Sequence, residues 1–202
     1  MTSPASRIKP ITFAAYPIDG GELPLAGPKF WSVFFSFKVN GWRGILHTPT
    51  ETLFNRKGEL LSIADAFEPA VKKLNNSPFE WLDVEALERR HKIGQGTLII
   101  LDIPVPVLTA RERYEKLVEA YGDQMLTVDV KPDPDSVLLM PQKEMASEES
   151  LYWWNRLQEI NKEYGADFYE GLVARRCDSL YPLQLDNPTR KCSSWTKHRW
   201  EF

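Results

Sequence analysis

Hydrophobic and polar positions alternate along much of this chain in short blocks, and turn residues separate the blocks. Alternation of this kind is typical of strands with one buried face. The strongest block, at residues 95–105, holds a nearly continuous apolar run. The sequence predicts strands at residues 30–39, 42–47, 50–55, 79–86, 95–105, 126–130, 168–176 and 194–200.

Other segments have the spacing of amphipathic helices. Residues 64–75 place apolar side chains on one helical face. A second helix is expected to begin at Thr109, with Glu112 as its capping-box partner, and to stop at Gly122. A third is expected over residues 147–164, from a Ser-x-x-Ser start to a stop at Gly165. This order of elements indicates one α+β domain over residues 11–202, mostly antiparallel with helices at the edges, after a loose tail at residues 1–10.

Composition narrows the class of protein. The chain has 202 residues, of which 43% are hydrophobic and 26% are charged, as in a soluble globular protein with one well-filled core. The formal net charge of −3 argues against a general basic coat for nucleic acid, although residues 170–202 carry six basic and four acidic residues. The seven tryptophans could serve as core or as stacking platforms for bases.

The cysteines and the hydropathy pattern suggest a compartment. Cys177 and Cys192 fit no zinc spacing, and no histidine pair accompanies them. We therefore expect free thiols in a reducing, cytoplasmic environment. We expect neither a membrane span nor a secretory leader, because no apolar run is long enough. We also expect a monomer.

Candidate chemistry begins at Lys38-Val-Asn-Gly41, which joins a lysine to a tight turn, with Arg43 five places after the lysine. A deprotonated lysine amine can attack the α-phosphate of a nucleotide and hold the product as a lysyl phosphoramidate. Alone, such a tetrapeptide is more often a turn with a solvated lysine. Its value comes from five segments that follow in order, at residues 54–58, 82–85, 101–102, 170–175 and 195–199.

Together the six segments resemble motifs I, Ia, III, IIIa, IV and V of the nucleotidyltransferase domain of ATP-dependent polynucleotide (DNA) ligases. The wider covalent nucleotidyltransferase superfamily also holds RNA ligases and mRNA capping enzymes. The resemblance covers about residues 29–199. The chain departs from the usual pattern at five positions. Ser36 and Asn40 stand where acids are commoner, Val84 replaces glycine, Leu101 replaces an aromatic residue, and Arg199 replaces lysine.

The resemblance implies two mostly antiparallel sheets flanked by helices. It also implies that Lys38 attacks ATP, releases pyrophosphate and holds AMP, with Lys197 as a second catalytic residue. It places Mg²⁺ on the hard carboxylate oxygens of Glu85 and Glu170, and a ribose contact is the alternative for Glu85. The nucleotide-binding residues that it implies are Phe37, Lys38, Arg43, Arg56, Glu85, Leu101, Glu170, Val173, Lys197 and Arg199.

Side-chain chemistry refines some of these assignments. The planar forks of Arg43 and Arg56 are expected to grip ribose hydroxyls or phosphate oxygens. By their positions, Phe37 and Val173 are candidate walls of the base pocket.

The expected substrate is a nicked DNA duplex, in DNA repair or DNA replication. An RNA ligase is an alternative that Asn40 favours, whereas Arg43 and residues 181–197 favour DNA, and a guanylyltransferase would prefer GTP. A non-catalytic nucleotide- or nucleic-acid-binding domain is the alternative of a different class. Ligases of this superfamily usually carry an OB-fold after motif V, and we expect none in this chain, because the sequence ends three residues after Arg199. A separate OB-fold or other accessory protein is therefore an expected partner, unless the enzyme works without one.

Overall fold

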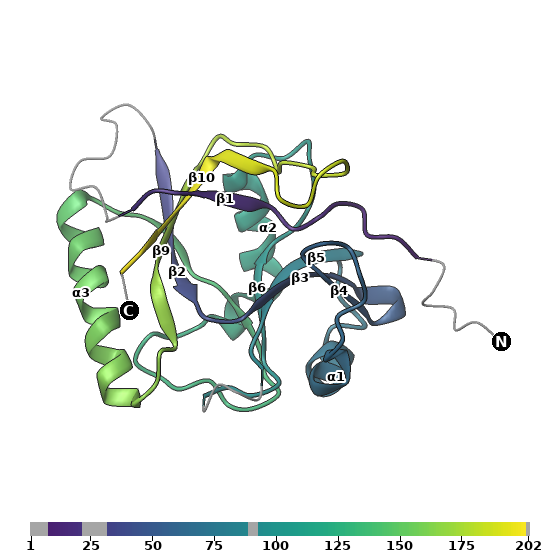
Figure 1. The fold of residues 1–202 in the computed structure, drawn as a ribbon, viewed down its shortest axis with the longest axis horizontal. Helices are drawn as coiled ribbons and strands as arrows, with labels where there is room; N and C mark the ends of the chain where they lie inside the picture. The colour runs from purple at the N-terminus through teal and green to yellow at the C-terminus, as the bar shows by residue number, and fades with distance from the viewer. Residues whose placement is uncertain (1–7, 22–31, 89–92, 201–202) are drawn as a thin grey trace.

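Within residues 8–21, 32–88 and 93–200, which the computed structural model describes, two five-stranded sheets form the framework and three α-helices pack against them (Figure 1). Sheet 1 has the strand order β1-β10-β9-β2-β8, and sheet 2 has the order β4-β3-β5-β6-β7. Sheet 1 consists of β1 (Tyr16–Asp19), β2 (Val33–Val39), β8 (Gln142–Glu144), β9 (Tyr169–Arg176) and β10 (Lys191–Arg199). Sheet 2 consists of β3 (Trp42–His47), β4 (Thr52–Asn55), β5 (Trp81–Ala86), β6 (Leu98–Asp102) and β7 (Val137–Leu139).

The helices cover different sheets. They are α1 (Glu68–Lys73), α2 (Ala110–Tyr121) and α3 (Ser147–Tyr164), with short 3₁₀ segments at Thr48–Thr50, Ala64–Phe67 and Gly122–Gln124. Figure 1 shows α3 beside β2 and β9, and α1 on the side of β3 and β4. Each helix buries apolar side chains. One large buried cluster joins α1 and α2 to sheet 2, and another joins α3 to sheet 1 and to Ile99 of β6.

Alternating side chains build these cores. In sheet 1, Phe37 and Leu172 pack against Leu157 of α3. In sheet 2, Leu46 of β3 packs in the cluster that contains Leu117 of α2. The outward-facing side of each strand remains available for polar side chains, because successive residues point to opposite faces.

Most pairings are antiparallel, and only β1 with β10 and β6 with β7 run parallel among the described strands. The predicted fold class, two mostly antiparallel sheets flanked by helices, is therefore confirmed. The strand predicted at residues 42–47 has the observed bounds of β3. The strand predicted at residues 30–39 is observed from Val33, and residues 30–31 lie outside the described part, as do residues 1–7 of the predicted tail.

The helix predictions hold in most details. The helix predicted at residues 147–164 has the bounds of α3, and Gly165 ends it with a φ of 63°. Its predicted serine cap is wrong, because Ala146 is the N-cap and makes no side-chain hydrogen bond. At α2, Thr109 and Glu112 form the predicted capping box. The predicted helix at residues 64–75 divides into a 3₁₀ turn followed by α1.

The strand predicted at residues 126–130 is wrong. Leu126 and Val128 are buried in the core of sheet 1, as their alternation implies, but the segment is not a strand. Leu126 makes one backbone hydrogen bond, to Leu139, and Val130 closes a turn back to Thr127. The edge position beside β6 belongs to β7, which the sequence did not predict.

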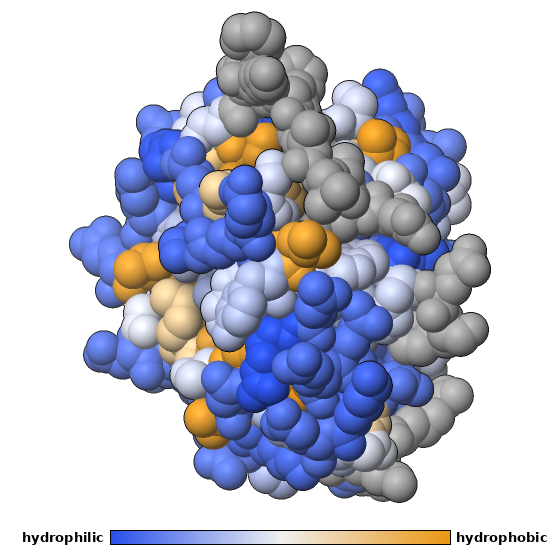
Figure 2. Space-filling model, turned by 90° about the vertical axis from the view of Figure 1, so that its left-hand side faces the viewer, coloured by the Kyte–Doolittle hydropathy of each residue, from blue (hydrophilic) through white to orange (hydrophobic). Residues whose placement is uncertain are grey.

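The face of the molecule on the side of α3 is mainly polar (Figure 2). On the side of the molecule where α3 lies, hydrophobic areas are small and separated by hydrophilic side chains (Figure 2). No helix in the described part of the chain has the length and apolar character needed to cross a bilayer. Cys177 and Cys192 lie in that part, buried and free of a disulfide, which confirms the prediction of free thiols.

Candidate active site

Three adjacent strands of sheet 1 bring the predicted catalytic lysines to one face. Lys38 on β2 pairs with Gly171 on β9, which pairs with Arg199 on β10. Two residues along β9, Val173 pairs with Lys197. Because cross-strand partners share a face of the sheet, these side chains gather on one side, opposite to the side that packs against α3.

Glu170 joins this face through a bulge. Lys38 pairs with Gly171, but Val39 pairs with Tyr169, so Glu170 is an extra residue in β9. A bulge changes the direction of the side chain that it carries. As a result, Lys38 Nζ donates a hydrogen bond to Glu170 Oε2, and the two groups form an ion pair. Their side chains are 21% and 14% exposed, so bulk water screens this pair only in part.

Sheet 2 supplies the opposite wall, where Arg43 on β3 pairs with Glu85 on β5. Gly41 precedes β3 and approaches β5 so closely that a Cβ atom would lie 2.8 Å from Glu85 Cγ. The turn therefore requires glycine. Burial raises the pKa of Glu85 to about 7, the positive charge of Lys38 opposes this rise, and the negative charge of Glu170 adds to it.

A cleft of about 890 Å³ opens between the two walls. All ten residues to which the sequence analysis gave catalytic, nucleotide-binding or metal-binding roles line this cleft. They are Phe37, Lys38, Arg43, Arg56, Glu85, Leu101, Glu170, Val173, Lys197 and Arg199. Segments separated by up to about 160 residues thus meet in one place, while the role of each residue stays a prediction.

Asp19 on β1 contacts two residues of the cleft lining, Lys197 and Arg199, and the sequence analysis missed it. Its carboxylate lies 3.0 Å from Lys197 Nζ, 3.4 Å from Lys191 Nζ and 3.5 Å from Arg199 Nη2. The hydrogen bond from Lys197 lowers the pKa of Asp19, so the carboxylate is charged near neutral pH. A four-residue strand has too little alternation to be recognised, and no spacing links Asp19 to the motifs.

Tyr16, on the same strand, was missed for the same reason. Lys197 Nζ lies 4.9 Å from the centre of its ring, and Arg56 Cζ lies 5.3 Å from it. The ring is thus shared by one cation from each sheet, and Tyr16 also lines the cleft.

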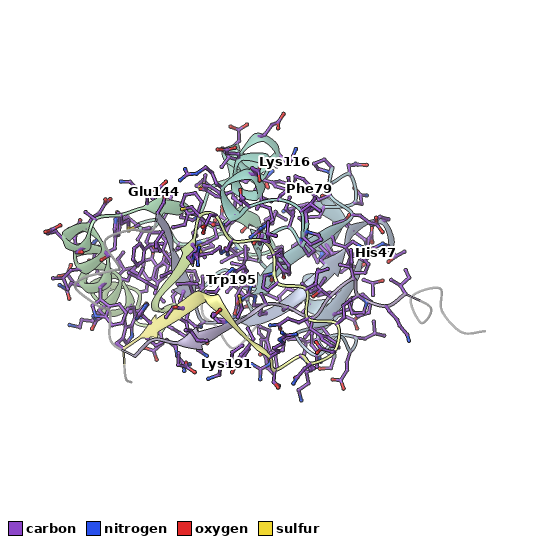
Figure 3. All side chains as sticks on the ribbon, turned by 90° about the horizontal axis from the view of Figure 1, so that it is seen from above. His47, Phe79, Lys116, Glu144, Lys191 and Trp195 are labelled. Atoms are coloured by element: carbon purple, nitrogen blue, oxygen red, sulfur yellow. The ribbon has the colours of Figure 1, made fainter. Side chains whose placement is uncertain are left out.

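The guanidinium of Arg43 is already engaged inside the protein. Its Nε and Nη2 lie 3.0 and 2.8 Å from the two oxygens of Asp83. The hydroxyl of Tyr181 donates a hydrogen bond of 2.7 Å to the same carboxylate. Arg43 also lies over the ring of Trp195 on β10. Trp195 is fully buried in the interior, whereas Lys191 at the start of the same strand is exposed (Figure 3). The fork that was expected to grip ribose or phosphate therefore has Asp83 as its partner.

Phe37 borders the cleft, but its ring is not placed as the predicted wall of the base pocket. Its ring packs against the rings of Trp153 and Tyr169 in the core between sheet 1 and α3. The distances between ring centres are 5.4 and 5.9 Å. The side chains of Leu101 and Val173 are partly exposed and line the cleft, so they remain candidates for the base pocket.

Within the described part of the chain, the protein alone does not form a magnesium site. Among the described residues, no group of three or more His, Cys, Asp or Glu side chains could hold a metal ion. Glu85 and Glu170 offer hard oxygen donors on opposite walls of the cleft. Since Mg²⁺ is usually held by one or two carboxylates together with water and substrate phosphates, these two residues fit an ion that arrives with a nucleotide.

Comparisons with known proteins define the class of fold. No protein-family model matches the sequence, and no curated protein matches it. Solved structures of DNA ligases do match. A Lig E DNA ligase, described as binding DNA with a minimal scaffold, has a TM-score of 0.60 at 14% identity over 93% of this chain and 68% of that chain.

Two further structures agree with this match. Chlorella virus DNA ligase-adenylate has a TM-score of 0.59 at 13% identity, over 91% of this chain and 68% of that chain. The ligase domain of LigD from M. tuberculosis has a TM-score of 0.54 at 16% identity, over 92% of this chain and 59% of that chain. At these identities the similarity establishes the fold, which is that of a ligase adenylation domain.

Proposed function

We propose that the protein is an ATP-dependent polynucleotide ligase that seals nicks in DNA through a covalent lysyl-AMP intermediate. The observation that carries this proposal is the position of the Lys38 amine. It is ion-paired with Glu170 in a cleft that Glu85 and Lys197 also line. Such a site offers a nucleophile, a proton acceptor and positive charge for phosphate in one place.

In the first step the Lys38 amine attacks the α-phosphorus of ATP. A nitrogen–phosphorus bond forms, the bond from phosphorus to the bridging oxygen breaks, and pyrophosphate leaves with the electron pair. Glu170 accepts a proton from the amine, since its carboxylate already accepts the hydrogen bond from Nζ. Lys197 stabilises the charge that develops on the phosphate oxygens.

In the following steps AMP moves to the substrate. A 5′-phosphate oxygen of the nick attacks the phosphorus of lysyl-AMP, and the amine of Lys38 leaves and regains its proton. The 3′-hydroxyl then attacks the activated 5′-phosphate, so that a phosphodiester bond forms and AMP is released. Mg²⁺, when held by Glu85, Glu170 and the phosphates, neutralises phosphate charge.

One argument for an RNA substrate becomes weaker with the structure. Asn40 replaces the aspartate that is commoner in the family, and some RNA-joining relatives share this change. Here Asn40 Nδ2 donates a hydrogen bond of 3.3 Å to the main-chain oxygen of Asp167. A carboxylate could not donate this bond, so asparagine has a local structural reason.

The test is self-labelling with α-³²P-labelled ATP and Mg²⁺. We expect label on the wild type and none on Lys38→Ala, because no other amine replaces the nucleophile. Lys143→Ala is the matched control, since Lys143 is an exposed lysine of β8 that pairs with Glu149. Equal labelling of wild type and Lys38→Ala would refute the mechanism.

The same preparations separate the alternatives. ATP binding without label would indicate a non-catalytic nucleotide-binding domain, and labelling by GTP in preference to ATP would indicate a guanylyltransferase. Sealing of nicked duplexes with DNA or RNA on the 3′-hydroxyl side distinguishes a DNA ligase from an RNA ligase. A requirement for an added OB-fold protein would show that a partner completes the reaction.

A further inference from the structure

Strand β1 brings two side chains to the cations of the cleft, although no motif includes β1. Tyr16 and Asp19 stand at its two ends, and β1 pairs in parallel with β10. Through this pairing Asp19 lies opposite Lys197. The strand therefore adds an aromatic ring to the cleft lining, and it places a carboxylate beside Lys197 and Arg199 of that lining.

The ring of Tyr16 lies close to two like charges. Lys197 comes from sheet 1 and Arg56 follows β4 of sheet 2, and both cations approach the ring within 5.3 Å of its centre. Like charges repel, whereas the negative face of an aromatic ring attracts each of them. Tyr16 can therefore hold the two cations near one another when no anion is bound.

Asp19 balances three cations with one carboxylate. Lys191, Lys197 and Arg199 all lie within 3.5 Å of its oxygens. The Asp19 side chain is 49% exposed, so a dissolved anion has access to the same place. An anion with more charge and more oxygens makes stronger charge-assisted hydrogen bonds to these cations than one carboxylate does.

The number and spread of the cations indicate the chemical class of that anion. Arg56, Lys197 and Arg199 of the cleft lining, with Lys191 beside Asp19, provide four positive charges near Tyr16 and Asp19. A single phosphate is too small to contact all of them, whereas a diphosphate group distributes its charge over several oxygens. This set of cations fits the β- and γ-phosphates of a nucleoside triphosphate, or the pyrophosphate that the triphosphate releases.

We propose that β1 pre-organises these cations as a binding site for the diphosphate group of the nucleotide. Tyr16 is a positioning residue that holds Arg56 and Lys197, and Asp19 is an exchangeable counter-ion that the diphosphate displaces. The proposal rests on the proposed function only in taking ATP as the nucleotide.

Removal of the Tyr16 ring and removal of the Asp19 charge should change pyrophosphate affinity in opposite directions. A general structural role of β1 would not produce this result. The test is calorimetric measurement of the binding of inorganic pyrophosphate, ATP and AMP, without divalent cations. Asp19→Asn is expected to tighten pyrophosphate binding by roughly threefold to tenfold, because the competing charge is gone. Tyr16→Leu is expected to weaken it about fivefold, because the cations separate. AMP binding is expected to change less than pyrophosphate binding in both variants, because AMP has only the α-phosphate.

Matched variants serve as controls. Tyr16→Phe keeps the ring and should bind pyrophosphate as the wild type does. Asp186→Asn removes an exposed carboxylate that pairs with Arg190 outside the cleft lining, and it should have no effect. If Tyr16→Leu does not fold, the sign of the Asp19→Asn effect still decides the question.

Other results would overturn the proposal. Equal signs for Asp19→Asn and Tyr16→Leu, weaker pyrophosphate binding by Asp19→Asn, or equal changes for AMP and pyrophosphate would each do so. Self-labelling reports separately on the proposed function. A chain that does not label itself but shows the opposite signs keeps the diphosphate site and loses the ligase mechanism.

Discussion

At the scale of single residues, burial and neighbouring charges set the chemistry of the cleft. Glu85 illustrates this, because burial raises its pKa from the ordinary value of 4.5 to about 7. Lys38 limits the rise and Glu170 increases it. A carboxylate with this pKa changes its charge within the physiological range.

The raised pKa predicts a pH-dependent stability. Between pH 4.5 and about 7 the folded protein keeps a proton on Glu85 that the unfolded chain releases, so the contribution of Glu85 to stability falls as pH rises through this window. Glu85→Gln removes this loss. We compare the free energy of unfolding of the variant with that of the wild type at each pH. This difference should be more favourable to the variant at pH 8 than at pH 4.5, by about 1–3 kcal/mol.

The measurement is urea unfolding of both proteins at several pH values, without divalent cations. Glu119→Gln is the control, because Glu119 is exposed on α2 and outside the cleft lining. An unfolding difference between Glu85→Gln and wild type that does not change from pH 4.5 to pH 8 would contradict the prediction.

At the scale of elements, the bulge in β9 determines where Glu170, the proposed proton acceptor, lies. The extra residue, Glu170, reaches Lys38 because Gly171 takes a φ of 145° beside it. A Cβ at Gly171 would lie 2.0 Å from the main-chain oxygen of His198 on β10. Neither the dihedral angle nor the space allows another residue, so the strand pairing and the position of Glu170 depend on this glycine.

Gly171→Ala is therefore expected to lower the free energy of unfolding by roughly 3 kcal/mol or more and to abolish self-labelling. Gly165→Ala is a matched control, because Gly165 has a φ of 63° and a Cβ there meets nothing within 4 Å. That change should cost only about 1 kcal/mol. Urea unfolding measures both costs, and similar losses for the two variants would argue against a special role of the bulge.

At the scale of the whole molecule, a buried ionic cluster joins the two sheets and α2. Asp102 of β6 accepts hydrogen bonds from Arg113 Nε at 2.9 Å and Arg175 Nη1 at 2.7 Å. All three side chains are at most 5% exposed. Arg175 belongs to sheet 1, where it also lies 3.8 Å from the centre of the Trp195 ring. The cluster therefore fixes the separation of the cleft walls.

Asp102→Asn should leave two buried guanidinium groups without their carboxylate. Removal of one partner from a buried pair typically costs about 3–5 kcal/mol, because the remaining charge stays desolvated. Asp178→Asn is the control, since Asp178 pairs with Arg176 at the surface, where such pairs contribute little. A free energy of unfolding for Asp102→Asn close to that of the control would show that the cluster is not needed to hold the sheets together.

The sequence predicted the long elements because their patterns are local. The period of α3 and the capping box of α2 follow from neighbouring residues, and the structure has both. Strands β1, β7 and β8 have only three or four residues, and pairing with distant strands stabilises them. No local pattern therefore predicted them. The failed strand at residues 126–130 shows the converse, because a correct burial pattern does not ensure a hydrogen-bonding partner.

The candidate site divides in the same way. Ordered motifs predicted which residues meet, and all ten line the cleft. They did not predict that Asp83 occupies the fork of Arg43, that the Phe37 ring packs against α3, or that Tyr16 and Asp19 face the cations. Such contacts depend on strand register and sheet separation.

By itself the sequence determined the fold class, most long elements and the set of residues that gather around Lys38, because residue types, periods and motif order are properties of the chain. Only the tertiary structure decided which charges are paired, which face each ring takes and how Glu170 reaches the amine. These depend on distances between residues far apart in sequence, and in a partly buried cleft such distances set the strength of each interaction.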